Sequence, residues 1–145
     1  MYFLLLDKKT TFINTKYPLI LISPVKGGNN MANVQKTLAL ILGIILAILG
    51  IWGFFIDSIL GFGVNPAQSV LHLIGGAFGI YSGTKGMGKG FNISIGWIGI
   101  VLGILGFIPT IDGLLSDYLN INQAITWLHL ILGVVFVIIG YTVKE

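Results

Sequence analysis

The chain has 145 residues, of which 55% are hydrophobic and only 9% are charged, and its mean hydropathy is +0.96. A water-soluble domain of this size needs more charge on its surface. The sequence contains no cysteine, which excludes disulfides, thiolate metal sites and cysteine nucleophiles. The composition therefore predicts a single membrane domain with almost no soluble mass.

Residues 1–30 carry the entire excess of positive charge. They hold four lysines against Asp7, whereas residues 31–145 hold four lysines against four acidic residues. With purine-rich codons, the run Lys-Gly-Gly-Asn-Asn-Met at 26–31 encodes a ribosome-binding sequence, a spacer and a start codon. We therefore expect translation to begin at Met31, with a disordered, weakly basic N-terminal extension as the alternative. The overall charge then gives no reason to expect nucleic acid as a partner.

Four segments approach the length of about 20 mostly apolar residues that a membrane-spanning helix needs. They lie at 36–56, 67–83, 92–111 and 123–143, and the second is the shortest. The lysines beyond residue 31 all fall on one side of such a four-span arrangement, and Asp57, Asp112 and Asp117 fall on the other. Lysine-bearing short loops stay in the cytoplasm. We therefore expect a multi-pass protein of the cell membrane, residues 31–145, with both termini cytoplasmic.

The sequence at 65–76 recurs at 122–133, 57 residues later, and the two copies hold the only two histidines. Asn-Pro-Ala-Gln-Ser-Val-Leu-His-Leu-Ile-Gly-Gly matches Asn-Gln-Ala-Ile-Thr-Trp-Leu-His-Leu-Ile-Leu-Gly. The preceding apolar segment repeats too, 42–50 matching 98–106 at an offset of 56. These matches predict an all-α, four-helix transmembrane bundle made of two tandem helical hairpins, at about 36–83 and 92–143. Two spans per unit give both hairpins the same orientation.

Small residues mark the expected helix contacts. In lipid, apolar side chains gain little by packing together, so helices associate where small residues allow their backbones to approach closely. We expect this packing role for Gly43, Gly50, Gly76, Gly83, Gly99, Gly103, Gly106, Gly133 and Gly140. Asn65 and Asn122 are typical helix N-caps, and Pro66 suits the first helical position.

His72 and His129 each follow their cap asparagine by seven residues. A rise of about 1.5 Å per residue places both about 10 Å below the outer ends of their helices. Glycines share their helix faces, so both imidazoles are expected to point into the bundle. Three interpretations stay open: a hydrogen bond to a neighbouring helix, axial ligation of one haem or a metal ion, or the lining of a polar pathway. The sequence offers no candidate catalytic residues.

Over residues 34–143 the pattern resembles a family of small four-helix membrane proteins called domain of unknown function 4383. The shared signature is an asparagine followed by Leu-His-Leu and a glycine, present here as Asn65, Leu71, His72, Leu73 and Gly76, and again as Asn122, Leu128, His129, Leu130 and Gly133. The resemblance implies the fold and no activity.

From the residues themselves we expect a structural or accessory membrane subunit without enzymatic activity. It would associate with itself, or with a larger membrane partner, through its glycine-rich faces. The alternatives are a bis-histidine haem or metal binder and a minimal oligomeric channel or carrier.

Overall fold

The computed structural model describes residues 30–144, so the expected N-terminal extension lies almost wholly outside the described residues. Five helices and one small β-hairpin follow one another along the chain. They are α1 (Asn30–Trp52), β1 (Ser58–Ile59), β2 (Phe62–Gly63), α2 (Pro66–Lys85), α3 (Gly88–Leu105), α4 (Pro109–Leu119) and α5 (Gln123–Thr142). The two strands are antiparallel, with Ser58 opposite Gly63.

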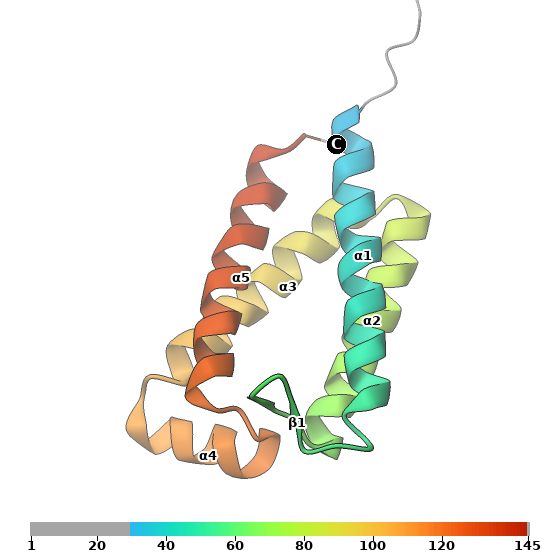
Figure 1. Ribbon diagram of the computed structural model, residues 1–145. Helices are drawn as coiled ribbons and strands as arrows, with labels where there is room; N and C mark the ends of the chain where they lie inside the picture. The colour runs from blue at the N-terminus through green and yellow to red at the C-terminus, as the bar shows by residue number, and fades with distance from the viewer. Residues whose placement is uncertain (1–29, 145) are drawn as a thin grey trace, which may run out of the picture.

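The four long helices form two pairs. Helix α1 packs along α2, and α3 packs along α5, which gives two helical hairpins standing side by side (Figure 1). The first turn of α1, the α2–α3 turn and the last turn of α5 meet at one end of the molecule, here called the N/C end. Helix α4 and the β-hairpin lie at the opposite end, here called the α4 end.

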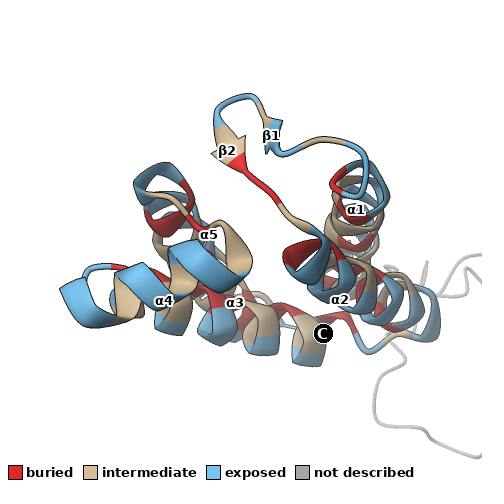
Figure 2. Cartoon of the chain, turned by 90° about the horizontal axis from the view of Figure 1, so that it is seen from below, coloured by how far each residue is buried: buried red, intermediate tan, exposed pale blue. Residues whose placement is uncertain are grey.

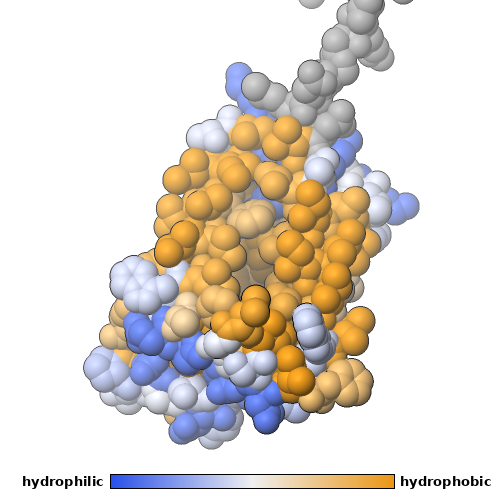
Figure 3. Space-filling model, viewed as in Figure 1, coloured by the Kyte–Doolittle hydropathy of each residue, from blue (hydrophilic) through white to orange (hydrophobic). Residues whose placement is uncertain are grey.

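Three of the described helices are long and apolar enough to cross a membrane: Val34–Trp52 in α1, Gly88–Leu105 in α3 and Gln123–Thr142 in α5. The segment expected at 67–83 forms α2. This helix is as long as α5, at 20 residues, but it is less hydrophobic, since it contains four glycines. On the face shown in Figure 3, hydrophobic side chains cover the middle of the molecule and most hydrophilic ones lie toward its ends. By length and composition, the described helices therefore fit a helical membrane protein.

The structure corrects the expectation in two places. The third segment, expected to run to residue 111, ends as a helix at Leu105, and a separate helix α4 begins at Pro109. Proline suits this first position because it has no N–H to donate and its φ is already helical. Helix α4 crosses the α4 end at a steep angle to the long helices (Figure 1) and has no buried residue. The second correction is the β-hairpin, which an all-α fold lacks.

Burial is concentrated where the helices of one hairpin touch and in the connections at the α4 end (Figure 2). Among the described residues, the buried hydrophobic side chains are Ala39, Val64, Ile121 and Ile125. Large apolar side chains such as Ile48 and Phe78 are instead more than half exposed, as lipid-facing residues are. The interior therefore depends on small and polar residues more than on a conventional apolar core.

Candidate functional site

Glycines bring the helices of each hairpin into backbone contact. A Cβ built on Gly43 would lie 2.7 Å from the carbonyl carbon of Gly79 and 2.9 Å from the oxygen of Gly76. A Cβ built on Gly133 would lie 2.7 Å from the oxygen of Gly96 and 2.9 Å from the carbonyl carbon of Gly99. No side chain fits at either contact.

All nine glycines expected to pack helices lie against the partner helix of their own hairpin. These faces are therefore covered within the chain itself. Association with a partner stays a prediction, and the outward faces of the hairpins are the surfaces left for it.

The two hairpins make corresponding contacts in a register that differs from the sequence match. Gly50 lies against Leu73, and Gly103 lies against Leu130, its counterpart 57 residues later. Glycines in or just after α1 therefore correspond to glycines 53 residues later, in or just after α3. The matched pairs are Gly43 with Gly96, Gly50 with Gly103, and Gly53 with Gly106. The expected offset of 56 is three residues larger, close to one helical turn.

Asparagines brace the two hairpins together at the α4 end. The Asn65 Oδ1 accepts a hydrogen bond from the Gln68 N–H (2.8 Å), and the Asn122 Oδ1 accepts one from the Ile125 N–H (3.0 Å), so both are N-caps. Each also uses its Nδ2 to reach the other half of the chain. Asn65 donates to the Tyr118 oxygen (2.9 Å), and Asn122 donates to the Gly61 oxygen (3.0 Å). A third amide, Asn120, donates to the Val64 oxygen (2.9 Å).

A buried amide pair joins the hairpins at the N/C end. Gln35 and Asn92 are both fully buried. The Asn92 Nδ2 donates to the Gln35 side-chain Oε1 (2.7 Å) and to its backbone oxygen (3.0 Å). The Gln35 Nε2 in turn donates to the backbone oxygens of Val143 (2.8 Å) and Ile139 (3.0 Å) in and after α5. This network connects α1, α3 and α5.

An apolar cavity of about 680 Å³ lies between the two polar braces. All four long helices line it, and Leu119 and Ile121 contribute at the α4 end. Some of its lining residues, among them Phe78 and Ile98, are more than half exposed on the lipid-facing surface. A hollow between the two hairpins is visible on the surface in Figure 3. The cavity therefore opens sideways between the hairpins rather than along the axis of the bundle.

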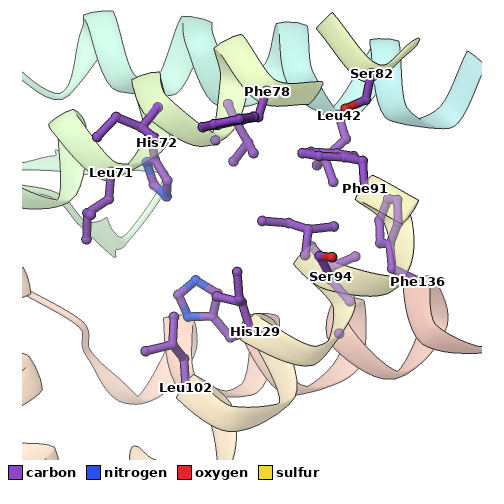
Figure 4. A pocket seen from close by; sticks show the side chains of 18 of the residues that line it. Leu42, Leu71, His72, Phe78, Ser82, Phe91, Ser94, Leu102, His129 and Phe136 are labelled. Atoms are coloured by element: carbon purple, nitrogen blue, oxygen red, sulfur yellow. The ribbon is translucent and has the colours of Figure 1, made fainter. Parts of the chain in front are cut away.

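His72 and His129 face each other across this cavity, one from α2 and one from α5 (Figure 4). Both also line a smaller adjoining pocket of about 80 Å³ beside the β-hairpin. The expectation that both point into the bundle thus matches the geometry. One of the three interpretations, a hydrogen bond to a neighbouring helix, finds no support at Nδ1: this atom of both rings is buried without a partner among the described residues.

This arrangement can supply two imidazole ligands or two hydrogen-bonding groups to one occupant of the cavity. No cluster of three or more histidine, cysteine, aspartate or glutamate side chains suited to a metal ion occurs in residues 30–144. Two imidazoles alone leave a tetrahedral zinc site incomplete.

Sequence reasoning missed Gln35, Asn92 and Asn120. For Gln35 and Asn92 the sequence signal is that an amide in an apolar segment needs hydrogen-bond partners away from water. That signal identifies a polar contact without identifying the partner. Asn120 instead ends α4 in the left-handed conformation, which asparagine tolerates at a helix C-terminus.

The family model described as Domain of unknown function (DUF4383) matches residues 36–142. The chain therefore belongs to this family. No curated protein and no solved structure matches it.

Proposed function

We propose that this member of the DUF4383 family is a four-span integral membrane protein without enzymatic activity that serves as a structural or accessory subunit. The observation that carries the proposal is that the amide side chains make hydrogen bonds within the protein. The amides of Gln35 and Asn92 at one end, and of Asn65, Asn120 and Asn122 at the other, all hydrogen-bond between the two halves of the chain. They stabilise the assembly rather than face a substrate.

Helix α2 is the fourth span in this proposal. Its 20 residues give a length of about 30 Å, which matches the hydrocarbon core of a bilayer. The glycine face of α2 packs along α1. If α1 crosses the membrane, α2 therefore lies beside it in the same layer and crosses it too. The tandem repeat is supported by the corresponding contacts of the two hairpins and by the parallel roles of Asn65 and Asn122.

A cytoplasmic location for the N/C end is supported by the charges. Lys36, Lys85, Lys89 and Lys144 all belong to that end, whereas Asp57, Asp112 and Asp117 belong to the α4 end. The positive-inside rule then places both termini in the cytoplasm and α4 on the outer surface. The apolar residues of α4, such as Leu114 and Tyr118, are exposed and suit the membrane interface.

The partner surface in this proposal is the outward face of the hairpins, because the glycine faces are covered. In a bilayer such a face can meet lipid or another helix of similar apolar character. A channel is less well supported, since the amide hydrogen bonds join the hairpins at both ends of the bundle and Ile121 is buried at the α4 end.

Native mass spectrometry of the protein released from membranes in mild detergent tests the accessory role. We expect a complex of defined composition, either several copies of the chain or one copy with another membrane protein. A monomer at every protein concentration and in every mild detergent would contradict the proposal.

A further inference from the structure

We propose that the cavity between the hairpins binds a neutral, lipid-soluble molecule of the quinone type, with an apolar tail and a polar ring that His72 and His129 hold from opposite sides. This inference goes beyond an accessory role, and it does not depend on any protein partner. It rests on the geometry of the cavity, on the unused hydrogen-bonding capacity of the two histidines and on the distribution of charge.

The size and opening of the cavity suit a lipid-soluble ligand. Pockets for small molecules and cofactors have volumes of about 300–1,000 Å³, and this one has about 680 Å³. Its lining is apolar apart from a few side chains, and exposed residues of α2 and α3 form its rim. Because the amide braces occupy both ends of the bundle, the open route into the cavity leads from the lipid phase.

The two histidines give the cavity one polar region. A neutral imidazole offers one N–H donor and one acceptor nitrogen. Neither ring hydrogen-bonds to any residue in 34–144, and the buried Nδ1 atoms lack partners. Buried polar atoms in proteins are otherwise nearly always hydrogen-bonded, so an occupant with polar atoms would complete these two sites.

The placement of the rings favours a flat ligand with two acceptors on opposite edges. His72 and His129 come from different hairpins and face each other across the cavity, while Phe78, Phe91 and Phe136 lie farther along it toward the N/C end (Figure 4). A quinone ring carries two carbonyl oxygens on opposite edges, each able to accept an N–H. Its apolar tail would then extend over the phenylalanines.

The charge distribution favours a neutral ligand over an anionic one. The histidines lie toward the α4 end, whose charged residues are Asp57, Asp112 and Asp117, and every lysine of the described chain belongs to the N/C end. A fatty acid carboxylate held at the histidines would lie in the half of the molecule that carries only negative charge. The propionates of a bis-histidine haem would meet the same acidic surroundings.

Ring-nitrogen NMR on the whole chain in lipid bicelles tests the proposal. The protein contains only two histidines, so ¹⁵N-histidine labelling with a histidine-free affinity tag reports on this site alone. The probes are decylubiquinone, hexadecane as a tail without a polar group, and palmitate as an anion. We expect decylubiquinone to shift the signals of both histidines and to saturate near one equivalent. Hexadecane should leave the signals in place, and palmitate should need about tenfold higher concentration.

Two variants of α3 provide a matched comparison. Ile98 and Ile104 are both 53% exposed, but only Ile98 lines the cavity. Ile98→Trp should weaken decylubiquinone binding at least about tenfold by filling the cavity, and Ile104→Trp should leave it unchanged.

Three results would overturn the proposal: no saturable shift with decylubiquinone, equal shifts with hexadecane, or unchanged binding in a folded Ile98→Trp protein. A Soret band on addition of haem, lost in His72→Ala/His129→Ala, would replace the quinone-type ligand with haem. The three-probe comparison uses the unaltered chain and decides the question even if a variant does not fold.

Discussion

Asn92 is the residue on which the N/C end most depends. It is fully buried, and its two donated bonds satisfy both oxygens of Gln35, which in turn reaches α5. Asn92→Leu would leave the Gln35 Oε1 buried without its donor. Stranding a buried polar group costs about 1–3 kcal/mol, and we expect the free energy of unfolding to fall by that amount. Reversible unfolding in SDS and mild-detergent mixtures measures it.

Thr84→Val is the matched control for Asn92→Leu. The Thr84 hydroxyl donates only to Ile80 and Tyr81, in the preceding turn of its own helix, and the residue is exposed. Its loss should change the unfolding free energy by less than about 0.5 kcal/mol. Equal effects of the two substitutions would show that the Gln35–Asn92 pair does not stabilise the contact between the hairpins.

At the scale of single residues, local sequence rules predicted the helix caps, but they did not predict hydrogen-bond partners that are distant in the sequence. The caps at Asn65 and Asn122 follow from residue type and position, because an N-cap bonds to its own helix three residues later. The second bond of each asparagine crosses to a segment more than 50 residues away. Nothing in the local sequence specifies that partner, and the same holds for Gln35 with Asn92.

At the scale of elements, the hairpins depend on backbone contact at their glycines. A methyl group at Gly133 would come within 3 Å of the backbone of Gly96, Gly99 and Ile100. Gly133→Ala should therefore force α3 and α5 apart and reduce stability by about 1–3 kcal/mol, the usual cost of overpacking. Gly76→Ala should have the same effect on α1 and α2, since Gly43 and Ala47 crowd it in the same way.

Gly90→Ala tests whether crowding, rather than any loss of glycine, explains such an effect. A Cβ at Gly90 in α3 has no neighbour within 4 Å. Alanine has a higher helix propensity than glycine, so this variant should unfold at the same or a slightly higher SDS fraction. A destabilisation as large as that of Gly133→Ala would contradict the packing argument.

Element boundaries were predictable where hydrophobicity changes sharply and not elsewhere. Helices α2 and α5 occupy the expected segments. Helix α1 overlaps 36–56 but ends at Trp52, and 92–111 contains a break between α3 and α4, because apolar residues continue through both boundaries. Periodicity cannot reveal strands of two residues, such as β1 and β2. The register in which the two hairpins make corresponding contacts was missed because Ile- and Gly-rich segments match one another at several offsets. Only the contacts distinguish an offset of 53 from one of 56.

At the scale of the whole molecule, polar groups are concentrated at both ends and the apolar cavity lies between them. The amide braces connect the hairpins through hydrogen bonds that are directional, whereas the middle offers only the weak preference of apolar groups for one another over lipid. The two hairpins are thus held at their ends and left apart at the level of His72 and His129. The helices pack closely within each hairpin. The separation between the hairpins therefore explains how so small a protein encloses a ligand-sized space.

The absence of cysteine makes the membrane topology directly measurable, because any introduced cysteine is unique. Ser116→Cys lies in α4 at the α4 end, and Thr84→Cys lies in the last turn of α2 at the N/C end; both residues are exposed. If the lysine-rich N/C end is cytoplasmic, a membrane-impermeant maleimide should label Ser116→Cys in intact cells and Thr84→Cys only after permeabilisation. The reverse pattern would place the termini outside. Labelling of both sites in intact cells would mean that α3 does not span, because α3 is the only long helix between the two sites.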